Sequence, residues 1–165
     1  PVENLLIDIQ DQGLELLRTS GFQRYEVSAF SLPHRQARHN VNYWQFGDYL
    51  GKGAGAHGKI TAVAQETIVR TRKKKQPAHY LADCTAATAV VSAQDLPLEF
   101  MLNALRLQNG FTVDLFEAHT GLAFSKVAKR IESLHAKGLL EIDGKRIKTS
   151  AKGMQFLNSV LEEFL

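Results

Sequence analysis

Six consecutive residues bring together side chains suited to a flat, iron-containing ligand. Residues 39–44 read HNVNYW and include the only tryptophan of the chain, Trp44. An imidazole can ligate iron, and aromatic rings can stack on a planar ligand. The alternative is structural: the rings of Tyr43 and Trp44 anchor a loop to the core, while His39 and Asn40 satisfy its backbone. From these residues alone the structural alternative has the greater weight.

A glycine-rich run follows this segment. Residues 51–58 read GKGAGAHG, and Gly53, Gly55 and Gly58 formally satisfy the dinucleotide-binding pattern G-x-G-x-x-G. The context does not fit that pattern, because β-branched residues rather than a helix follow and Glu66 comes too soon for the usual acid. The missing side chains would let backbone amides approach a ligand closely. A tight strand-to-loop bend in a barrel or sheet explains the glycines equally well.

The remaining reactive side chains carry less information. His34, His39 and His57 have no carboxylate or cysteine at ligand spacing beside them, which argues against a structural zinc site. Cys84 is the single cysteine, so a disulfide framework and a self-contained thiolate metal cluster are both excluded. It lies among alanine and threonine residues without a basic neighbour, so we expect a buried, inert thiol. No catalytic residue is assigned.

Two groups of charges are expected at the surface. Asp95 and Glu99 are four residues apart near Arg106, a pattern typical of solvated charge pairs on a helix. Residues 70–75 read RTRKKK and are expected to form a solvated loop, with contact to phosphate or to an acidic partner as the alternative.

Composition narrows the class of protein. The 165 residues are 44% hydrophobic and 22% charged, as in globular proteins, which excludes a disordered tail. No apolar run approaches the roughly 18 residues that span a bilayer, and no leader-like segment opens the chain. The net charge is +3, but residues 70–75 carry five of the positive charges. The chain is therefore not a uniformly basic nucleic-acid binder.

The first half predicts parts of an α/β fold. Residues 3–20 have leucine and isoleucine at helical spacing, and Gly21 is placed to end the helix. Residues 25–30 alternate in a way that predicts one strand buried on both faces. Residues 31–58 are irregular, which in a compact domain indicates function. Residues 59–71 predict one or two strands, and a short helix is expected after Pro77.

The second half predicts a small, mainly helical module. Helices are expected over 95–107, 112–119 and 125–137, and a final helix over about 151–165. Asp143-Gly144 lies between two short β-prone runs, which is a strong hairpin signal. This order of elements is typical of a winged helix. A winged helix that contacts DNA or a protein is therefore one functional hypothesis, although residues 112–165 carry only a slight excess of positive charge.

Several motifs, taken in order, resemble one family. Residues 25–30 (YEVSAF) are similar to its YEISNF strand, with Ala29 in place of the asparagine, and residues 39–44 match its HNxxYW motif. Residues 47–57 (GDYLGKGAGAH) match the glycine loop that follows. Residues 98–111 and 148–158 are similar to its later motifs. The chain resembles the oxygen-independent coproporphyrinogen III oxidase-like radical SAM proteins, in their haem-chaperone (HemW-type) branch.

This resemblance implies a fold and a set of ligands. The fold class is α/β: residues 1–92 would be the last units of a radical SAM partial TIM-type barrel, and residues 93–165 a small winged-helix-like domain. The implied cofactors are S-adenosylmethionine, a [4Fe–4S] cluster and haem, in a cytoplasmic protein. The family's cluster is bound by a Cys-x3-Cys-x2-Cys loop that these residues lack. Because the first residue is Pro1 rather than methionine, we also expect the chain to be the C-terminal part of a longer protein, inactive in radical chemistry by itself.

The resemblance also implies roles for particular residues. His39 would be the axial ligand of haem iron, with Asn40, Tyr43 and Trp44 as further haem contacts. The loop of Gly53, Gly55 and Ala56 would border the adenosyl group of S-adenosylmethionine.

The implied function is haem chaperoning, in which haem is bound and passed to an acceptor protein that the sequence does not identify. The alternatives are oxidative decarboxylation of a porphyrinogen and the winged-helix binding module. Haem or porphyrin is the expected partner, and nucleic acid is not.

Overall fold

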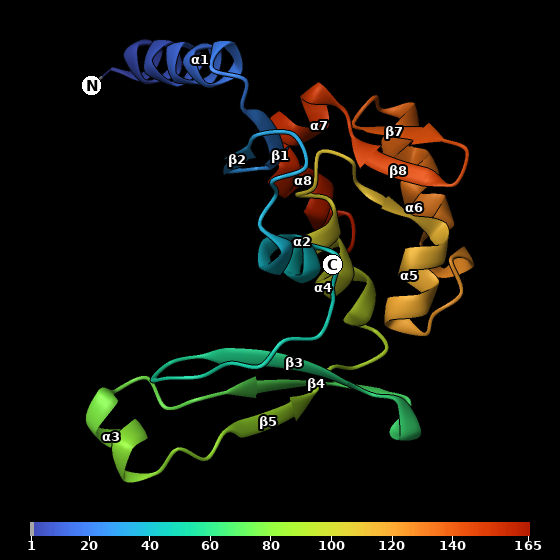
Figure 1. Ribbon diagram of the computed structural model, residues 1–165. Coiled ribbons are helices and arrows are strands. Elements are labelled where there is room, and N and C mark those ends of the chain that lie inside the picture. The colour runs from blue at the N-terminus through green and yellow to red at the C-terminus, as the bar shows by residue number, and fades with distance from the viewer. Residues whose placement is uncertain (1) are drawn as a thin grey trace.

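The chain begins with a long helix and a short hairpin. The computed structural model describes residues 2–165, and of Glu3 its backbone alone. Helix α1 spans Glu3–Thr19, and Gly21 follows it with a φ of 82°, as the sequence predicts. In Figure 1, α1 lies at the top, away from the C-terminal helices. Most of its apolar residues are exposed, including Leu6 and Leu16, while Leu14 and Leu17 are partly buried. The amphipathic helix is therefore confirmed, but most of its apolar face is not buried by the described residues.

The predicted strand over residues 25–30 is wrong. Two short strands, β1 (Gln23–Glu26) and β2 (Ala29–Ser31), form an antiparallel hairpin instead. The buried Glu26 carboxylate stabilises the turn between the two strands. Its Oε1 accepts hydrogen bonds from the backbone N–H and the hydroxyl of Ser28, both at 2.9 Å. An alternating sequence cannot distinguish a strand from a hairpin that is closed by its own side chain.

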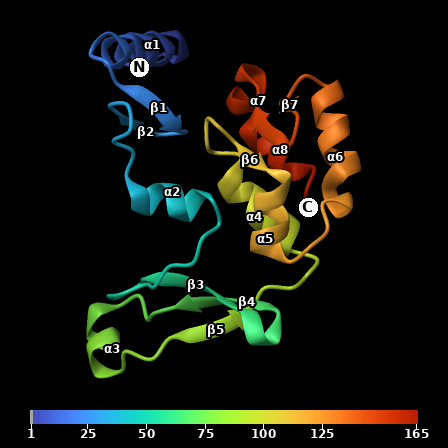
Figure 2. The same ribbon diagram turned by 45° about the vertical axis from the view of Figure 1, so that its right-hand side comes forward.

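The segment expected to be an irregular loop contains a helix. Helix α2 spans Arg38–Trp44 and holds the whole HNVNYW segment. It has no side-chain cap at its start and no buried residue, so its sequence carries little helical signal. Seen in Figure 2, α2 lies between the β1–β2 hairpin and the large sheet.

A three-stranded antiparallel sheet forms the middle of the chain. Strands β3 (His57–Ala62) and β4 (Thr67–Arg72) are joined by a 3-10 turn, Val63–Gln65, and the prediction of one or two strands here resolves to two. Helix α3 (Pro77–Ala82) leads to β5 (Ala87–Val90), which pairs with β4. The predicted loop over residues 70–75 is therefore partly wrong, because Arg70 to Arg72 belong to β4.

The C-terminal half agrees closely with prediction. Its helices are α4 (Leu96–Ala104), α5 (Val113–Thr120) and α6 (Ser125–Ala136). The Asp143-Gly144 turn joins β7 (Leu140–Asp143) to β8 (Arg146–Thr149), and β6 (Phe111–Thr112) pairs with β8. The single final helix is wrong: α7 (Ala151–Gln155) and α8 (Leu157–Glu162) are separated at Phe156.

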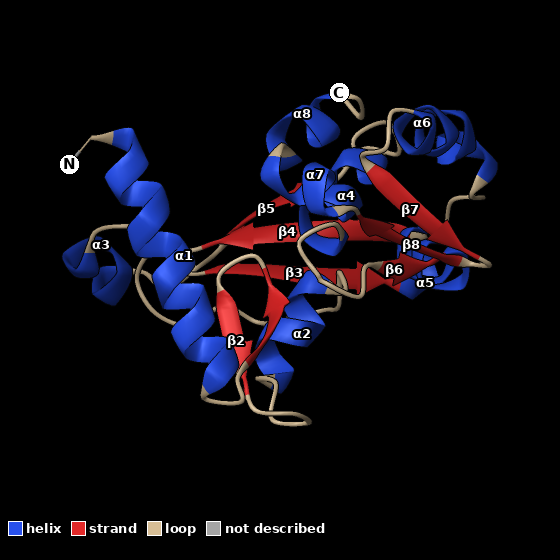
Figure 3. Cartoon of the chain, turned by 90° about the horizontal axis from the view of Figure 1, so that it is seen from above, coloured by secondary structure: helices blue, strands red, loops and turns tan. Residues whose placement is uncertain are grey.

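The hydrophobic core lies mainly in this half. Phe100 of α4 is at its centre, with ring centroids 5.0 Å from Phe111 and 5.1 Å from Phe116, both nearly perpendicular. Phe46, just after α2, joins the same core at 5.7 Å from Phe100. Seen from above in Figure 3, helices α4–α8 gather at one end, while α1 and α3 lie at the other.

The chain is thus an α/β protein, as predicted, and every strand pair among residues 2–165 is antiparallel. Within the same residues, no helix has the length and apolar character needed to cross a membrane.

Candidate functional site

An open pocket of about 450 Å³ lies where α2, the large sheet and α4 meet. Aromatic and charged side chains from segments distant in sequence line it: Tyr43, Trp44, Tyr49, His57, Arg70, Glu99, Leu102, Asn103 and Arg106. Two of these, Tyr43 and Trp44, belong to the HNVNYW segment. The pocket therefore joins a predicted binding motif to residues that the sequence analysis did not connect with it.

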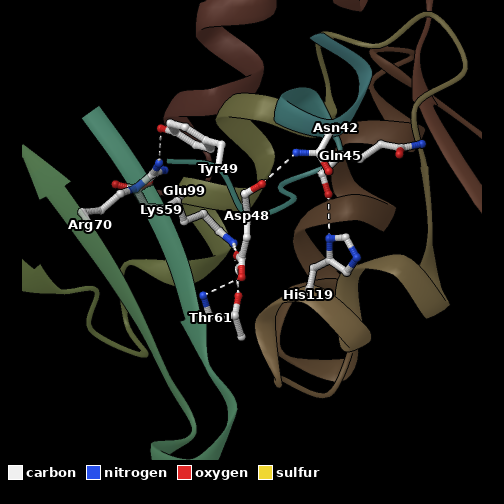
Figure 4. Close-up of polar contacts among 9 residues, drawn as sticks. All are labelled: Asn42, Gln45, Asp48, Tyr49, Lys59, Thr61, Arg70, Glu99 and His119. Carbon is white, nitrogen blue, oxygen red and sulfur yellow. Dashed lines mark hydrogen bonds and ion pairs between the residues drawn. The ribbon is translucent and has the colours of Figure 1, made fainter. Parts of the chain in front are cut away.

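Hydrogen bonds to groups outside α2 hold this short helix in place. The Asn40 amide donates to the Tyr25 hydroxyl at 3.1 Å, and the Asn42 amide donates to the Asp48 carbonyl at 2.9 Å. At the end of the helix, His119 Nδ1 donates to the Gln45 carbonyl at 2.8 Å. Figure 4 shows the contacts of Asn42 and Gln45 at the end of α2, with Asp48 on one side and His119 of α5 on the other. Tertiary hydrogen bonds thus supply the support that its sequence lacks.

The aromatic rings of the pocket stand at steep angles to one another. Tyr43 and Trp44 have centroids 4.7 Å apart at 84°, and Tyr43 and Tyr49 are 4.9 Å apart at 57°. Such edge-to-face pairs are favourable arrangements of aromatic side chains. They give the pocket rigid apolar walls.

Two arginines bring positive charge to these walls. Arg70 forms an ion pair with Glu99 and donates to the Tyr49 hydroxyl at 3.0 Å. The guanidinium of Arg106 lies 4.4 Å from the centroid of the Trp44 ring, a cation–π contact, and reaches the buried Glu26 carboxylate at 3.3 Å. Its Nε is buried and has no hydrogen-bond partner among the described residues.

Burial and pairing shift the pKa values of two of these groups. Burial lowers the pKa of Arg70, but the hydrogen bond and the charge of Glu99, together with Tyr49 and Tyr43, outweigh it, so the net shift is upward. Burial also raises the pKa of the Tyr49 hydroxyl. Both shifts keep the pair in its arginine-cation, neutral-phenol form at ordinary pH.

A partly buried ion pair beneath the pocket ties the segment after α2 to the sheet. Lys59, only 1% exposed, donates to Asp48 at 2.7 Å, and its ammonium lies 4.4 Å from the Phe46 ring centroid. Partial burial raises the pKa of Asp48, but hydrogen bonds from Lys59 and Thr61 outweigh it and lower the pKa overall. Burial lowers the pKa of Lys59, although Asp48 opposes that shift.

The glycine run forms the bend that enters β3. Gly53 and Gly55 have left-handed φ values of 102° and 73°. The Gly55 N–H donates to the Lys74 carbonyl at 2.8 Å, and the Ala56 carbonyl accepts from Lys73 at 2.8 Å. The Gly53 N–H donates to the Tyr80 hydroxyl at 3.3 Å. No atom lies within 4 Å of the position that a Cβ would occupy on Gly53, so this part of the bend faces open space.

The structure brings together some of the predicted site residues and separates others. His39 is exposed and is not in the pocket lining, whereas His57 is. Gly53, Gly55 and Ala56 also lie outside the lining. Within residues 2–165, no group of three or more histidine, cysteine or acidic residues could hold a metal ion. Cys84 is exposed, so the expected buried thiol is wrong.

Sequence reasoning missed the polar part of the pocket. The sequence predicted charge pairs along one helix for Glu99 and Arg106. Instead, Glu99 pairs with Arg70 of β4, and Arg106 pairs with Glu26 of β1. One signal was available: Glu99, Asn103 and Arg106 are spaced four and three residues apart, which places polar groups in one stripe of an otherwise apolar helix. Their partners could not be read from any local pattern.

Comparison with known proteins connects the chain to one group. Residues 91–156 match the HemN C-terminal domain family. The whole chain is 39% identical to the heme chaperone HemW of Escherichia coli, covering 44% of that protein, and to HemW of Haemophilus influenzae, covering 43%. It is also 33% identical to the mitochondrial radical S-adenosyl methionine domain-containing protein 1 of mouse, covering 98% of this chain and 39% of that protein. The chain thus spans less than half the length of these relatives.

A solved structure shares the fold. Coproporphyrinogen III oxidase (HemN) of Escherichia coli, described as a radical SAM enzyme, superposes on 99% of this chain and 42% of its own, with a TM-score of 0.66. The two sequences are 18% identical over this match, so the likeness establishes the fold alone.

Proposed function

We propose, from the membership of this chain in the HemW-type family, that it is the haem-binding C-terminal part of a haem chaperone. In this proposal the full-length protein binds haem and passes it to an acceptor protein. The observation that carries it is the place of the family's HNxxYW motif: Tyr43 and Trp44 line an aromatic pocket that also contains two arginines. Similarity to HemW over the whole chain supports haem as the cargo.

The haem would be bound across α2 and the pocket. His39 is exposed and one helical turn before Tyr43, so its imidazole and the Tyr43 ring lie on neighbouring positions of one helix face. We assign His39 as the axial ligand of the iron, Tyr43 and Trp44 as the apolar wall, and Asn40 as the residue that orients α2 through Tyr25. His57, in the pocket lining, is the competing imidazole.

Of the two cofactors implied for the full-length protein, S-adenosylmethionine fits these residues and the [4Fe–4S] cluster does not. The bend of Gly53, Gly55 and Ala56 would contact S-adenosylmethionine. The open space beside the Cβ position of Gly53 supports this. When bound with a cluster, S-adenosylmethionine supplies radical chemistry. A [4Fe–4S] cluster needs several thiolates, and Cys84 is the only cysteine, so these residues do not fit a cluster.

We also propose a division of the chain into two domains, on the basis of the family resemblance. Residues 1–92 would be the end of a radical SAM barrel, and residues 93–165, with β6-α5-α6-β7-β8 in that order, a winged-helix-like domain. The match of residues 91–156 to the HemN C-terminal domain supports this boundary. We further propose a cytoplasmic location.

Two alternatives are less well supported. Oxidative decarboxylation of a porphyrinogen would follow the structural neighbour, but that neighbour is 18% identical, against 39% for HemW. DNA binding would need free cations on the C-terminal domain. Three of its lysines are instead paired with acids: Lys137 with Glu163, Lys145 with Asp114 and Lys148 with Glu141.

The test is a titration of the chain with ferric haem, followed by absorbance in the Soret region. We expect a shift that saturates near one equivalent and a weaker, altered shift in His39→Ala. The matched control is His79→Ala, since His79 is exposed on α3, outside the pocket. A shift that depends on His57 instead of His39 would reject the assigned ligand, and the absence of saturable binding would reject haem binding by this part of the protein.

A further inference from the structure

We infer that Arg70 and Arg106 make the pocket a receptor for the free carboxylates of a tetrapyrrole. This inference rests on the proposed function and adds to it a requirement on the cargo: a flat ring system whose edge bears carboxylates. It concerns the edge of the ligand rather than its metal. It therefore predicts binding of tetrapyrroles that contain no iron.

Arg106 has hydrogen-bond donors that no protein group within residues 2–165 uses. A guanidinium has five N–H donors in a planar fork. The described structure gives Arg106 one ion pair, with Glu26 at 3.3 Å, which is longer than the 2.7–2.9 Å typical of charge-assisted hydrogen bonds. The Arg106 side chain is 28% exposed and its Nε has no hydrogen-bond partner among the described residues, so the guanidinium has unused donors.

The guanidinium of Arg106 also lies beside the aromatic wall of the pocket. It lies 4.4 Å from the Trp44 ring centroid, so the aromatic wall and the cation are neighbours. A ligand that packs against Trp44 brings its edge to Arg106. Guanidinium and carboxylate bind through two parallel hydrogen bonds, which favours a carboxylate at that edge over a neutral polar group.

More cationic than anionic side chains line the pocket. Arg70 and Arg106 face a single lining acid, Glu99, and His57 adds a further nitrogen donor. Arg70 is fixed by Glu99 and Tyr49 and is about a quarter exposed. Each arginine is paired with an acid, but Glu26, the partner of Arg106, is buried outside the lining, so the pocket surface presents two guanidinium groups and one carboxylate within aromatic walls. This combination suits a planar anion.

The test compares two iron-free ligands that differ only at the carboxylates. Protoporphyrin IX has two free carboxylates, and its dimethyl ester has none. Binding to the chain is measured by the change in porphyrin fluorescence at fixed ionic strength. We expect the diacid to bind about tenfold more tightly or better, as charge-assisted hydrogen bonds predict. Equal affinity for the two ligands would overturn the inference and leave haem binding through His39 intact.

Variants then locate the effect without disturbing the fold. Leu102 lines the pocket and is 43% exposed, so Leu102→Glu and Leu102→Lys change its charge at a solvent-accessible position. The glutamate variant should bind the diacid several-fold more weakly than the lysine variant, whereas the uncharged ester should bind the two variants equally. Leu81→Glu, at an exposed leucine of α3, is the matched control and should change neither. Identical affinities in all three variants would place the ligand elsewhere and overturn the inference.

Arg106→Lys completes the set. It keeps a cation beside the buried Glu26 but removes the fork, so the variant should fold and lose most of the preference for the diacid. If neither porphyrin nor haem binds the wild-type chain, the inference and the proposed function both fail. If haem binds in a His39-dependent manner while the diacid shows no preference, the inference alone fails.

Discussion

At the scale of single residues, the site depends on charges that join distant parts of the chain. Arg106 and Glu26 are 80 residues apart, and Arg70 and Glu99 are 29 apart. Asp48 and Lys59 have the same function beneath the pocket, where Lys59 is almost completely buried. Pairs of this kind fix geometry, because a buried charge without its partner is costly.

Asp48→Asn tests this dependence. The substitution leaves the buried Lys59 ammonium without its anion, and we expect the free energy of unfolding to fall by about 2 kcal/mol. This is below the loss for a fully buried pair because the Asp48 side chain is 46% exposed and solvent screens the charge. Lys59→Met removes the ammonium while filling its space, so it should cost less than about 1 kcal/mol, alone or with Asp48→Asn. Urea denaturation measures each value.

The matched control is Asp114→Asn, which breaks the exposed pair with Lys145 and should cost less than about 1 kcal/mol. The effect of Asp48 should also depend on pH. Its pKa is lowered by folding, so its stabilising contribution is present above the ordinary value of 3.8 and is lost as the pH falls through the lowered pKa. An Asp48→Asn loss no larger than that of Asp114→Asn would contradict this account.

At the scale of elements, α2 is the part on which the site most depends. It is seven residues long, has no buried residue, and is held by Tyr25, Asp48 and His119 from outside. Gly47, just beyond it, lies so close that a Cβ would stand 2.2 Å from the Asn42 side-chain oxygen. The end of α2 and the segment that follows it are therefore closely packed, with no space for a side chain at position 47.

Gly47→Ala should consequently displace the end of α2. We expect the free energy of unfolding to fall by about 1–3 kcal/mol, as for overpacked sites, and haem affinity to weaken because Tyr43 and Trp44 move. Thermal unfolding and the haem titration measure the two effects. Gly13→Ala is the control: nothing lies near its Cβ position inside α1, so it should stabilise by about 0.5–1 kcal/mol and leave haem binding unchanged. Equal behaviour of the two variants would refute the role assigned to α2.

The same contrast explains how much the sequence alone could predict. Helices α4, α5 and α6 and the hairpin at Asp143-Gly144 were predictable, because apolar spacing and turn residues are local signals. Helix α2 was not, since its support comes from other elements. The HNVNYW residues could be singled out as a candidate site from their types and from the family motif, but Arg70, Glu99 and Arg106 could not, because each has its partner on a different element.

At the scale of the whole molecule, the chain corresponds to only part of its relatives. It spans less than half the length of the HemW relatives, and most apolar residues of α1 are exposed. The described residues line an aromatic pocket, but they contain no group of side chains that could hold a metal ion. Haem binding and radical chemistry should therefore separate experimentally.

Anaerobic reconstitution with iron and sulfide tests that separation. We expect no stoichiometric [4Fe–4S] cluster in this chain, because one exposed cysteine cannot replace the several thiolates that a cluster needs. Iron content and the electron paramagnetic resonance of the reduced sample provide the measurement. The haem titration on the same sample should still saturate near one equivalent. A cluster that forms at full occupancy would contradict the division.

The central claim is that a tetrapyrrole binds against α2 and α4, and nuclear magnetic resonance tests it most directly. Amide signals of the labelled chain are followed while iron-free protoporphyrin IX is added, since its ring current shifts nearby protons. The account predicts the largest shifts in residues 39–49, at His57 and Arg70, and in residues 99–106. Shifts concentrated on α6 and the β7–β8 hairpin, or spread evenly over the chain, would contradict it.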